Sequence, residues 1–86
     1  MASLSVVMPA YNEAAHIERS VTEWHDGVVA AVPGAELVVI DDCSTDDTGA
    51  RLAALAERLR KLRVLRTPRN VGHGPALRLA LEQCAG

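Results

Sequence analysis

The chain has 86 residues, of which 49% are hydrophobic and 23% are charged, and its formal net charge is -2. This composition excludes an intrinsically disordered chain, and the charge balance gives no reason to expect a nucleic-acid partner. Cys43 and Cys84 form neither a metal-binding spacing nor a disulfide framework, so a reduced, cytoplasmic protein is expected. Residues 1–86 are expected to form one small domain without a signal peptide or a membrane span.

The first third of the chain predicts a strand followed by a helix. Leu4–Met8 is a short apolar run that ends at Pro9, a pattern typical of a buried parallel strand. Asn12 is a predicted N-cap, and Pro33 and Gly34 end the helix. The buried face of this helix is predicted to hold residues spaced four, three and four apart, namely Ile17, Val21, Trp24 and Val28.

The middle of the chain repeats this strand–helix order. Glu36–Ile40 is a second apolar strand that leads directly into Asp41 and Asp42. Three polar residues are predicted to cap the next helix: Ser44, Thr45 and Asp46. The core face of that helix is predicted to consist of Leu52, Leu55, Ala56 and Leu59.

The last third predicts a strand around Val64 and Leu65, a loop over residues 67–74, and a helix with Pro75 at its first position. The core face of this helix is predicted to be formed by Leu77, Ala80, Leu81 and Cys84. The resulting β-α-β-α-β-α order predicts the α/β class, a three-layer Rossmann-like parallel sheet with right-handed crossovers.

Ligands of open α/β sheets bind beyond the carboxyl ends of the strands, where three segments of this chain are expected to meet. The first, Pro9-Ala10-Tyr11-Asn12-Glu13, lacks the glycines of dinucleotide-binding and Walker loops, which argues against both kinds of site. Tyr11 either contacts a base or packs as an aromatic at the rim. Glu13 either faces a ligand or complements the helix dipole.

The second candidate segment is Asp41-Asp42-Cys43-Ser44, which begins with two adjacent carboxylates. Adjacent carboxylates repel each other, so a benefit must offset the repulsion. One carboxylate can support the loop while the other accepts a hydrogen bond from a base with an N–H group, such as uracil or guanine. The alternative is that both acids only cap the loop.

The third segment places Gly72 and Gly74 before a helix N-terminus, where free backbone N–H groups favour an anion. Asn70 is predicted to brace this loop, and Arg69 is a candidate for facing a phosphate. His73 either joins Arg69 or is simply solvated.

The strings VVMPAYNEAAHIERSV, ELVVIDDCSTDDT and RVLRTPRNVGHGPALRLAL resemble the start of a family 2 glycosyltransferase of the GT-A fold. The resemblance runs from Leu4 to Gly86, with the three motifs in order. The opening PAYNE and the RN-x-G-x-G loop most resemble polyprenyl-phosphate sugar transferases, including the dolichol-phosphate type.

This resemblance implies binding of a nucleoside-diphosphate sugar, such as a UDP- or GDP-sugar. Pro9, Tyr11 and Glu13 would line the nucleotide pocket. Asp42 would contact the base, and Asp41 would support the loop that follows the second strand. The third loop, Asn70–Gly74, which includes Gly72, would close over the nucleotide. The complete enzyme would use Mg²⁺ or Mn²⁺ and an acceptor such as a polyprenyl phosphate, at the inner face of a membrane.

The chain departs from the family pattern in what it lacks. It contains neither the Asp-x-Asp metal motif nor the general base, so it is expected to have no catalytic or metal-binding residues and to be inactive. Cys43 occupies a position where the family commonly has glycine. The family's first strand pairs with a fourth strand, so an open, apolar edge at Leu4–Met8 predicts self-association.

Two other classes are alternatives to an enzyme of this family. The first is a non-catalytic α/β binding or self-assembling module. The second is a phosphatase-like or response-regulator fold, which the acids after the second strand disfavour because those proteins place them after the first or third.

Overall fold

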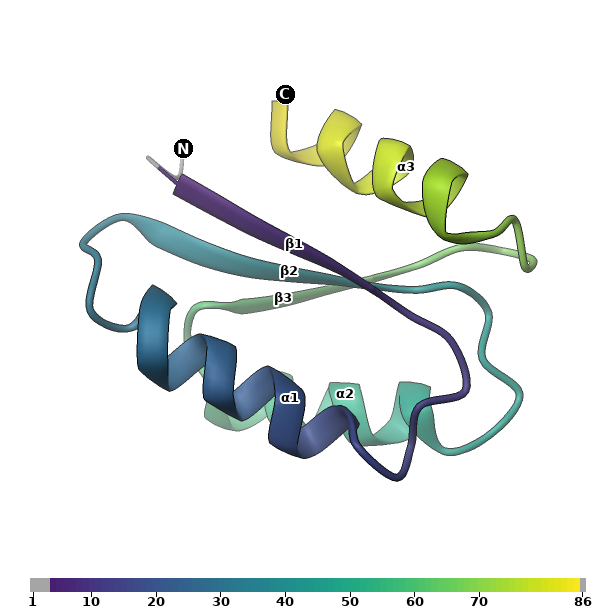
Figure 1. Ribbon diagram of the computed structural model, residues 1–86, viewed down its shortest axis with the longest axis horizontal. Helices are drawn as coiled ribbons and strands as arrows, with labels where there is room; N and C mark the ends of the chain where they lie inside the picture. The colour runs from purple at the N-terminus through teal and green to yellow at the C-terminus, as the bar shows by residue number, and fades with distance from the viewer. Residues whose placement is uncertain (1–3, 86) are drawn as a thin grey trace.

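The computed structural model describes residues 4–85, apart from the side chains at positions 73 and 83–85. Its elements are β1 (Leu4–Ala10), α1 (Ile17–Trp24), η1 (His25–Val29), β2 (Ala35–Asp41), α2 (Thr48–Arg58), β3 (Leu62–Arg66) and α3 (His73–Ala85). Figure 1 shows three layers, with α1 and α2 below the sheet and α3 above it. The predicted α/β class and the β-α-β-α-β-α order are therefore confirmed.

The sheet is parallel, and its order of strands is β1-β2-β3. The central strand β2 is covered on both faces, which explains why its residues form a continuous apolar run rather than an alternating one. Leu37, Val38 and Val39 are all fully buried. The predicted strand at 36–40 is thus the centre of the fold.

The backbone of β1 faces β2 on one side and is open on the other among the described residues. The Asp42 N–H donates to the Ala10 carbonyl over 2.8 Å, so the backbone groups of Ala10 point toward β2. The register is unbroken from Leu4 to Ala10, and the backbone groups of successive residues point to opposite sides. The backbone groups of Ser5, Val7 and Pro9 therefore face the open edge. Because Pro9 faces that edge, its lack of an N–H group removes no hydrogen bond between β1 and β2.

The first helix buries a different set of residues from the predicted one. Ile17 and Val21 are fully buried as expected, but Trp24 is 48% exposed and Val28 is 37% exposed. The segment His25–Val29 is a π-helix, in which the Ala30 N–H donates to the His25 carbonyl over 2.7 Å. In this wider turn the buried positions lie one residue later in the sequence than a regular α-helix predicts. His25 and Val29 therefore face the core instead of Trp24 and Val28.

The residues that α3 buries against the sheet also differ from the predicted ones. Ala80 is fully buried, but Leu81 is 57% exposed, and the fully buried Ala76 was not foreseen. Small residues four apart let the helix lie close to Val38 and Ile40 of the sheet, which form the upper core with them. The helix begins at His73, so Pro75 is not its first residue, and the predicted Cys84 lies outside the described side chains.

Candidate functional site

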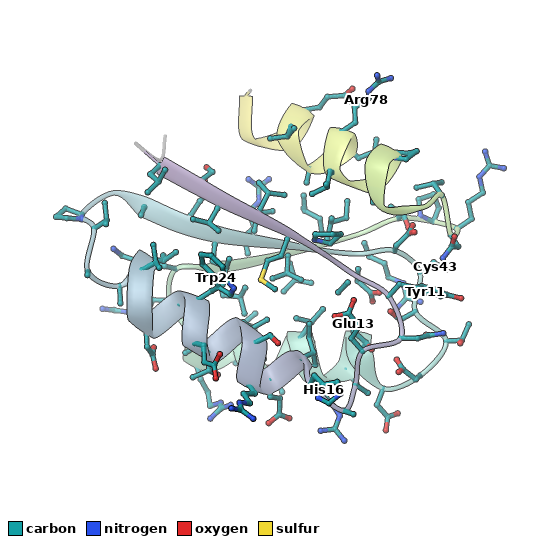
Figure 2. All side chains as sticks on the ribbon, in the orientation of Figure 1. Tyr11, Glu13, His16, Trp24, Cys43 and Arg78 are labelled. Atoms are coloured by element: carbon teal, nitrogen blue, oxygen red, sulfur yellow. The ribbon has the colours of Figure 1, made fainter. Side chains whose placement is uncertain are left out.

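Three loops meet beyond the carboxyl ends of the strands. Figure 2 labels Tyr11 and Glu13 of the first loop and Cys43 of the second. The first follows β1, the second follows β2, and the third follows β3. Their shared position at one rim is the arrangement in which open parallel sheets bind ligands.

Asn12 joins the first loop to the second. Its backbone lies in the left-handed region, with a φ of 49°, and its Oδ1 accepts hydrogen bonds from the backbone N–H groups of Thr45 at 2.7 Å and Asp46 at 3.3 Å. In return, the Asn12 N–H donates to Ser44 Oγ over 3.0 Å. The prediction that Asn12 caps the first helix is wrong, because α1 begins only at Ile17 and the Asn12 side chain turns toward the other loop.

Thr48 and Asp46 add a second connection between these loops. The Glu13 N–H donates to Thr48 Oγ1 over 2.8 Å, and the Ala14 N–H donates to Asp46 Oδ2 over 3.3 Å. Hydrogen bonds from the side chain and the backbone N–H of Thr48 hold the pKa of Asp46 below its ordinary value. The three residues predicted to cap α2 therefore have different partners. Asp46 bonds to Thr48 at the start of α2, whereas Ser44 and Thr45 bond to Asn12.

Asp42 joins the second loop to the third. Its side chain is fully buried, and Oδ1 accepts hydrogen bonds from Thr67 Oγ1 and the Val71 N–H, both at 2.9 Å. Its Oδ2 accepts from the Gly72 N–H at 2.8 Å. Since Gly72 immediately precedes α3, this carboxylate lies at the positive end of the helix dipole. Asp42 thus fixes the shape of the third loop.

The Asp41 carboxylate forms its hydrogen bonds within the second loop. It is fully buried, and its Oδ1 accepts from the Ser44 N–H at 3.0 Å and from the Ser44 hydroxyl. Its Oδ2 accepts no hydrogen bond from the described residues and lies 3.7 Å from Nη1 of Arg66. Gly49 leaves space for these groups, because a Cβ there would lie 2.9 Å from Asp41 Oδ2.

The remaining predicted residues lie around this network. Tyr11 is half-buried, and its N–H donates to Glu13 Oε1 over 3.3 Å. Pro9 is half-buried in β1, while Asn70 is exposed and its Nδ2 donates to the Asp42 carbonyl over 3.4 Å. The exposed Gly74 lies in the first turn of α3.

Cys43 adopts a φ of 57°, the left-handed conformation that glycine reaches more easily. Its half-buried thiol lies 3.8 Å from the Pro68 carbonyl. The side chain therefore fits at a position where the resemblance led us to expect glycine. The loop conformation is the one that glycine would favour.

Two hollows flank Leu79 on the α3 side of the sheet. One, of about 550 Å³, is lined by Val71, Gly74, Pro75, Arg78 and Leu79. The other, of about 380 Å³, is lined by Ile40, Leu65, Arg66, Thr67, Pro68 and Leu79. Of the predicted site residues, only Gly74 borders either hollow, so the two hollows do not lie between Tyr11 and Asp42.

Sequence reasoning missed three residues that hold the rim together, namely Thr48, Arg66 and Thr67. Thr48 and Thr67 are almost fully buried, and each bonds across to another loop. The available signal was the group of hydroxyl residues beside two adjacent carboxylates. Buried carboxylates require donors, and hydroxyl groups are the nearest ones in the sequence.

The described residues do not fit a divalent metal. They contain no group of three His, Cys, Asp or Glu side chains that could hold one, and the carboxylates of Asp41 and Asp42 are fully buried. Within residues 4–85, the helices are too short or too polar to cross a membrane.

Comparison with known proteins identifies the relatives of this chain. The model of the family described as "Glycosyl transferase family 2" matches residues 5–86. Glucosyl-3-phosphoglycerate synthase of Mycobacterium tuberculosis is 38% identical over 89 residues, covering 98% of this chain and 26% of that enzyme.

Solved structures agree with this family match. The mannosyltransferase PcManGT from Pyrobaculum calidifontis, in complex with GDP-Man and Mn²⁺, matches with a TM-score of 0.78 and 30% identity, covering 93% of this chain and 24% of that one. S. aureus TarS 1–349 in complex with UDP matches with a TM-score of 0.66 and 30% identity, covering 96% and 24%.

The chain spans about a quarter of the length of these relatives. Their named activities differ, so they do not single out the polyprenyl-phosphate sugar transferases. The shared part is the β-α-β-α-β-α unit, which matches the corresponding part of GT-A structures. This chain belongs to glycosyl transferase family 2.

Proposed function

We propose that the rim formed by the three loops binds a nucleoside-diphosphate sugar. The observation that supports this most strongly is the network through Asn12 and Asp42, which ties all three loops into one surface at the carboxyl ends of the strands. Relatives of the same family have been solved with GDP-Man and with UDP. A prearranged rim binds a ligand better because the loops lose little further entropy on binding.

In this proposal, each loop supplies a different part of the nucleotide site. Tyr11 contacts the base, with Pro9 and Glu13 beside it, and Asn70, Gly72 and Gly74 close over the nucleotide. Asp42 is fully buried, so in this proposal it serves the nucleotide site through the third loop, which its carboxylate holds in place. Asp41, which is also fully buried, supports the second loop through Ser44.

The variant Tyr11→Ala tests the contact with the base. Stacking of an aromatic side chain on a base contributes about 1–3 kcal/mol, so affinity for UDP or GDP is expected to fall by about 5- to 150-fold. His16→Ala is the matched control, because His16 is an exposed side chain of the same loop. Equal loss of affinity in both variants, measured by calorimetry, would count against the assignment of Tyr11.

The parent reaction proposed for a complete protein is inverting transfer of the sugar from the nucleotide to an acceptor. Mg²⁺ or Mn²⁺ would offset the charge of the departing diphosphate. A polyprenyl phosphate at the inner face of a membrane is the acceptor that we propose from the PAYNE and RN-x-G-x-G motifs. No catalytic step is assigned to the described residues, since they do not fit the metal.

The purified chain is expected to release no sugar from UDP-glucose or GDP-mannose above the buffer rate, with or without Mn²⁺. The physical reason is that the described residues contain no cluster of His, Cys, Asp or Glu side chains that could hold the metal. Detection of the released nucleotide by liquid chromatography checks this. Turnover that scales with protein concentration would overturn the expectation.

A second candidate function is that of a non-catalytic, self-assembling module. It is favoured by three apolar side chains that are exposed among the described residues, namely Leu4, Trp24 and Val28. Exposed apolar surface is where proteins associate.

A further inference from the structure

We infer that Arg66 is a positioning residue, which holds the second loop in place through Asp41 and Ser44 and thereby prepares the rim for a nucleotide. Its guanidinium meets a buried oxygen that accepts no hydrogen bond from the described residues, beside a glycine that leaves room for both groups. The effect on nucleotide binding rests on the proposed function, whereas the effect on the second loop does not.

Arg66 and Asp41 point to the same face of the sheet. They are register partners at the ends of β3 and β2. The residues just before them, Leu65 and Ile40, pack in the upper core against α3. Because successive side chains of a strand alternate between the two faces, Asp41 and Arg66 point to the opposite face. Figure 1 shows α2 below the sheet on that side.

The Asp41 carboxylate needs a positive partner on this face. It is fully buried, and its Oδ1 accepts from both the N–H and the hydroxyl of Ser44. Its Oδ2 lies 3.7 Å from Nη1 of Arg66. A buried charge is costly unless it is paired, so the cation of Arg66 stabilises the carboxylate where it stands.

Gly49, in the first turn of α2, makes this meeting possible. A Cβ at position 49 would lie 2.9 Å from Asp41 Oδ2 and 3.0 Å from Arg66 Nη1, which is closer than ordinary van der Waals contact. The Asp41 carboxylate is buried and held by Ser44, whereas the side chain of Arg66 is 55% exposed. A side chain at position 49 would therefore displace Arg66 rather than Asp41.

Arg66 also reaches the second loop directly. Its Nη2 donates to the Ser44 carbonyl over 3.3 Å, so one guanidinium meets both Asp41 and Ser44, which are bonded to each other. Ser44 Oγ in turn accepts from the Asn12 N–H over 3.0 Å, and Asn12 follows Tyr11 in the first loop. Arg66 thus acts on the first loop through Ser44, as a positioning residue rather than a contact of the base.

The test compares Arg66→Ala with Arg63→Ala, which removes an arginine near the other end of β3, 4.0 Å from Glu36. In Arg66→Ala, the Ser44 amide is expected to exchange about tenfold faster by NMR, since an ion pair and a hydrogen bond are lost together. Exchange of the β2 amides is the internal reference for opening of the whole sheet. Arg63→Ala is expected to match the wild-type chain.

The same variants are titrated with UDP and GDP. Affinity is expected to fall about fivefold in Arg66→Ala and to stay unchanged in Arg63→Ala. Arg66→Lys keeps a cation beside Asp41, so it is expected to lie closer to the wild-type chain than to Arg66→Ala in both measurements. Such a rescue would show that the charge, and not only the volume of the side chain, holds the loop.

Gly49→Ala tests the same contact without changing a charge. Alanine normally stabilises a helix relative to glycine, but here it is expected to lower the melting temperature and to speed exchange of the Ser44 amide, because its Cβ displaces Arg66. Gly27→Ala is the matched control, since a Cβ at that helical position meets no atom within 4 Å. It is expected to melt at or above the wild-type temperature.

Wild-type exchange of the Ser44 amide in Arg66→Ala would overturn the inference, as would a Gly49→Ala variant as stable as Gly27→Ala. Unchanged nucleotide affinity in Arg66→Ala, beside a wild-type chain that binds, would disprove the link to the nucleotide site. A wild-type chain that binds neither nucleotide would contradict the proposed function instead, and the exchange measurement would still decide the role of Arg66.

Discussion

Replacing Asp42 with alanine is expected to lower the free energy of unfolding by about 3–5 kcal/mol. The carboxylate is fully buried and accepts hydrogen bonds from Thr67, Val71 and Gly72. Each donor left without a partner costs about 1–3 kcal/mol. A domain of this length has a total stability of about 4–13 kcal/mol, so the variant loses a large share of it.

Urea denaturation followed by circular dichroism measures this loss. Asp47→Ala is the matched control, because Asp47 is an exposed aspartate near the same loop whose side chain forms no cap hydrogen bond to α2. Its unfolding midpoint is expected to stay close to that of the wild-type chain. If Asp42→Ala were as stable as Asp47→Ala, Asp42 would not be holding the third loop.

Asn12→Ala is expected to cost about 2–4 kcal/mol of stability. Alanine at a φ of 49° is strained by about 1 kcal/mol, and the variant also loses the bonds that Asn12 Oδ1 accepts from Thr45 and Asp46. These bonds connect the first loop to the second, so the first loop is also expected to exchange its amide protons faster. Thermal unfolding and hydrogen exchange by NMR measure both effects.

Asn12→Gly separates the two contributions. Glycine adopts the left-handed conformation without strain, so this variant loses the hydrogen bonds alone and is expected to be more stable than Asn12→Ala by about 1 kcal/mol. Equal stability of the two variants would mean that strain at this position contributes nothing. A wild-type melting temperature for both would mean that the Asn12 side chain does not join the loops.

The order of elements could be predicted from the sequence because each strand is a compact apolar run between turn residues. The strand at 36–40 was the clearest case, since burial on both faces removes alternation from its pattern. The meeting of three loops at one rim followed from the parallel order alone. These features depend on local pattern, which a single sequence displays directly.

The features that could not be predicted depend on contacts between distant residues. The π-turn at His25–Val29 shifted the buried face of the first helix by one residue, and a regular period of 3.6 residues does not foresee it. Asparagine is a residue type that often caps helices, but the left-handed backbone of Asn12 turns its side chain toward Thr45 instead. The burial of Asp42 required Thr67 and Gly72, which lie 25 and 30 positions away.

The network also decides how nucleotide binding must be tested. Because the buried Asp42 carboxylate holds the third loop, loss of binding in Asp42→Ala would report a disrupted loop rather than a lost ligand contact. The side chain of Tyr11 is half-buried and joins no hydrogen bond between the loops, so its replacement reports on the ligand contact itself.

The most direct test of the proposed function is a titration of the chain with UDP and with GDP, followed by NMR, with and without Mn²⁺. The proposal predicts saturable shifts at the amides of the three loops, one nucleotide preferred over the other, and little dependence on Mn²⁺, since the described residues hold no metal cluster. A folded chain whose loop amides do not shift with either nucleotide would contradict the proposed function.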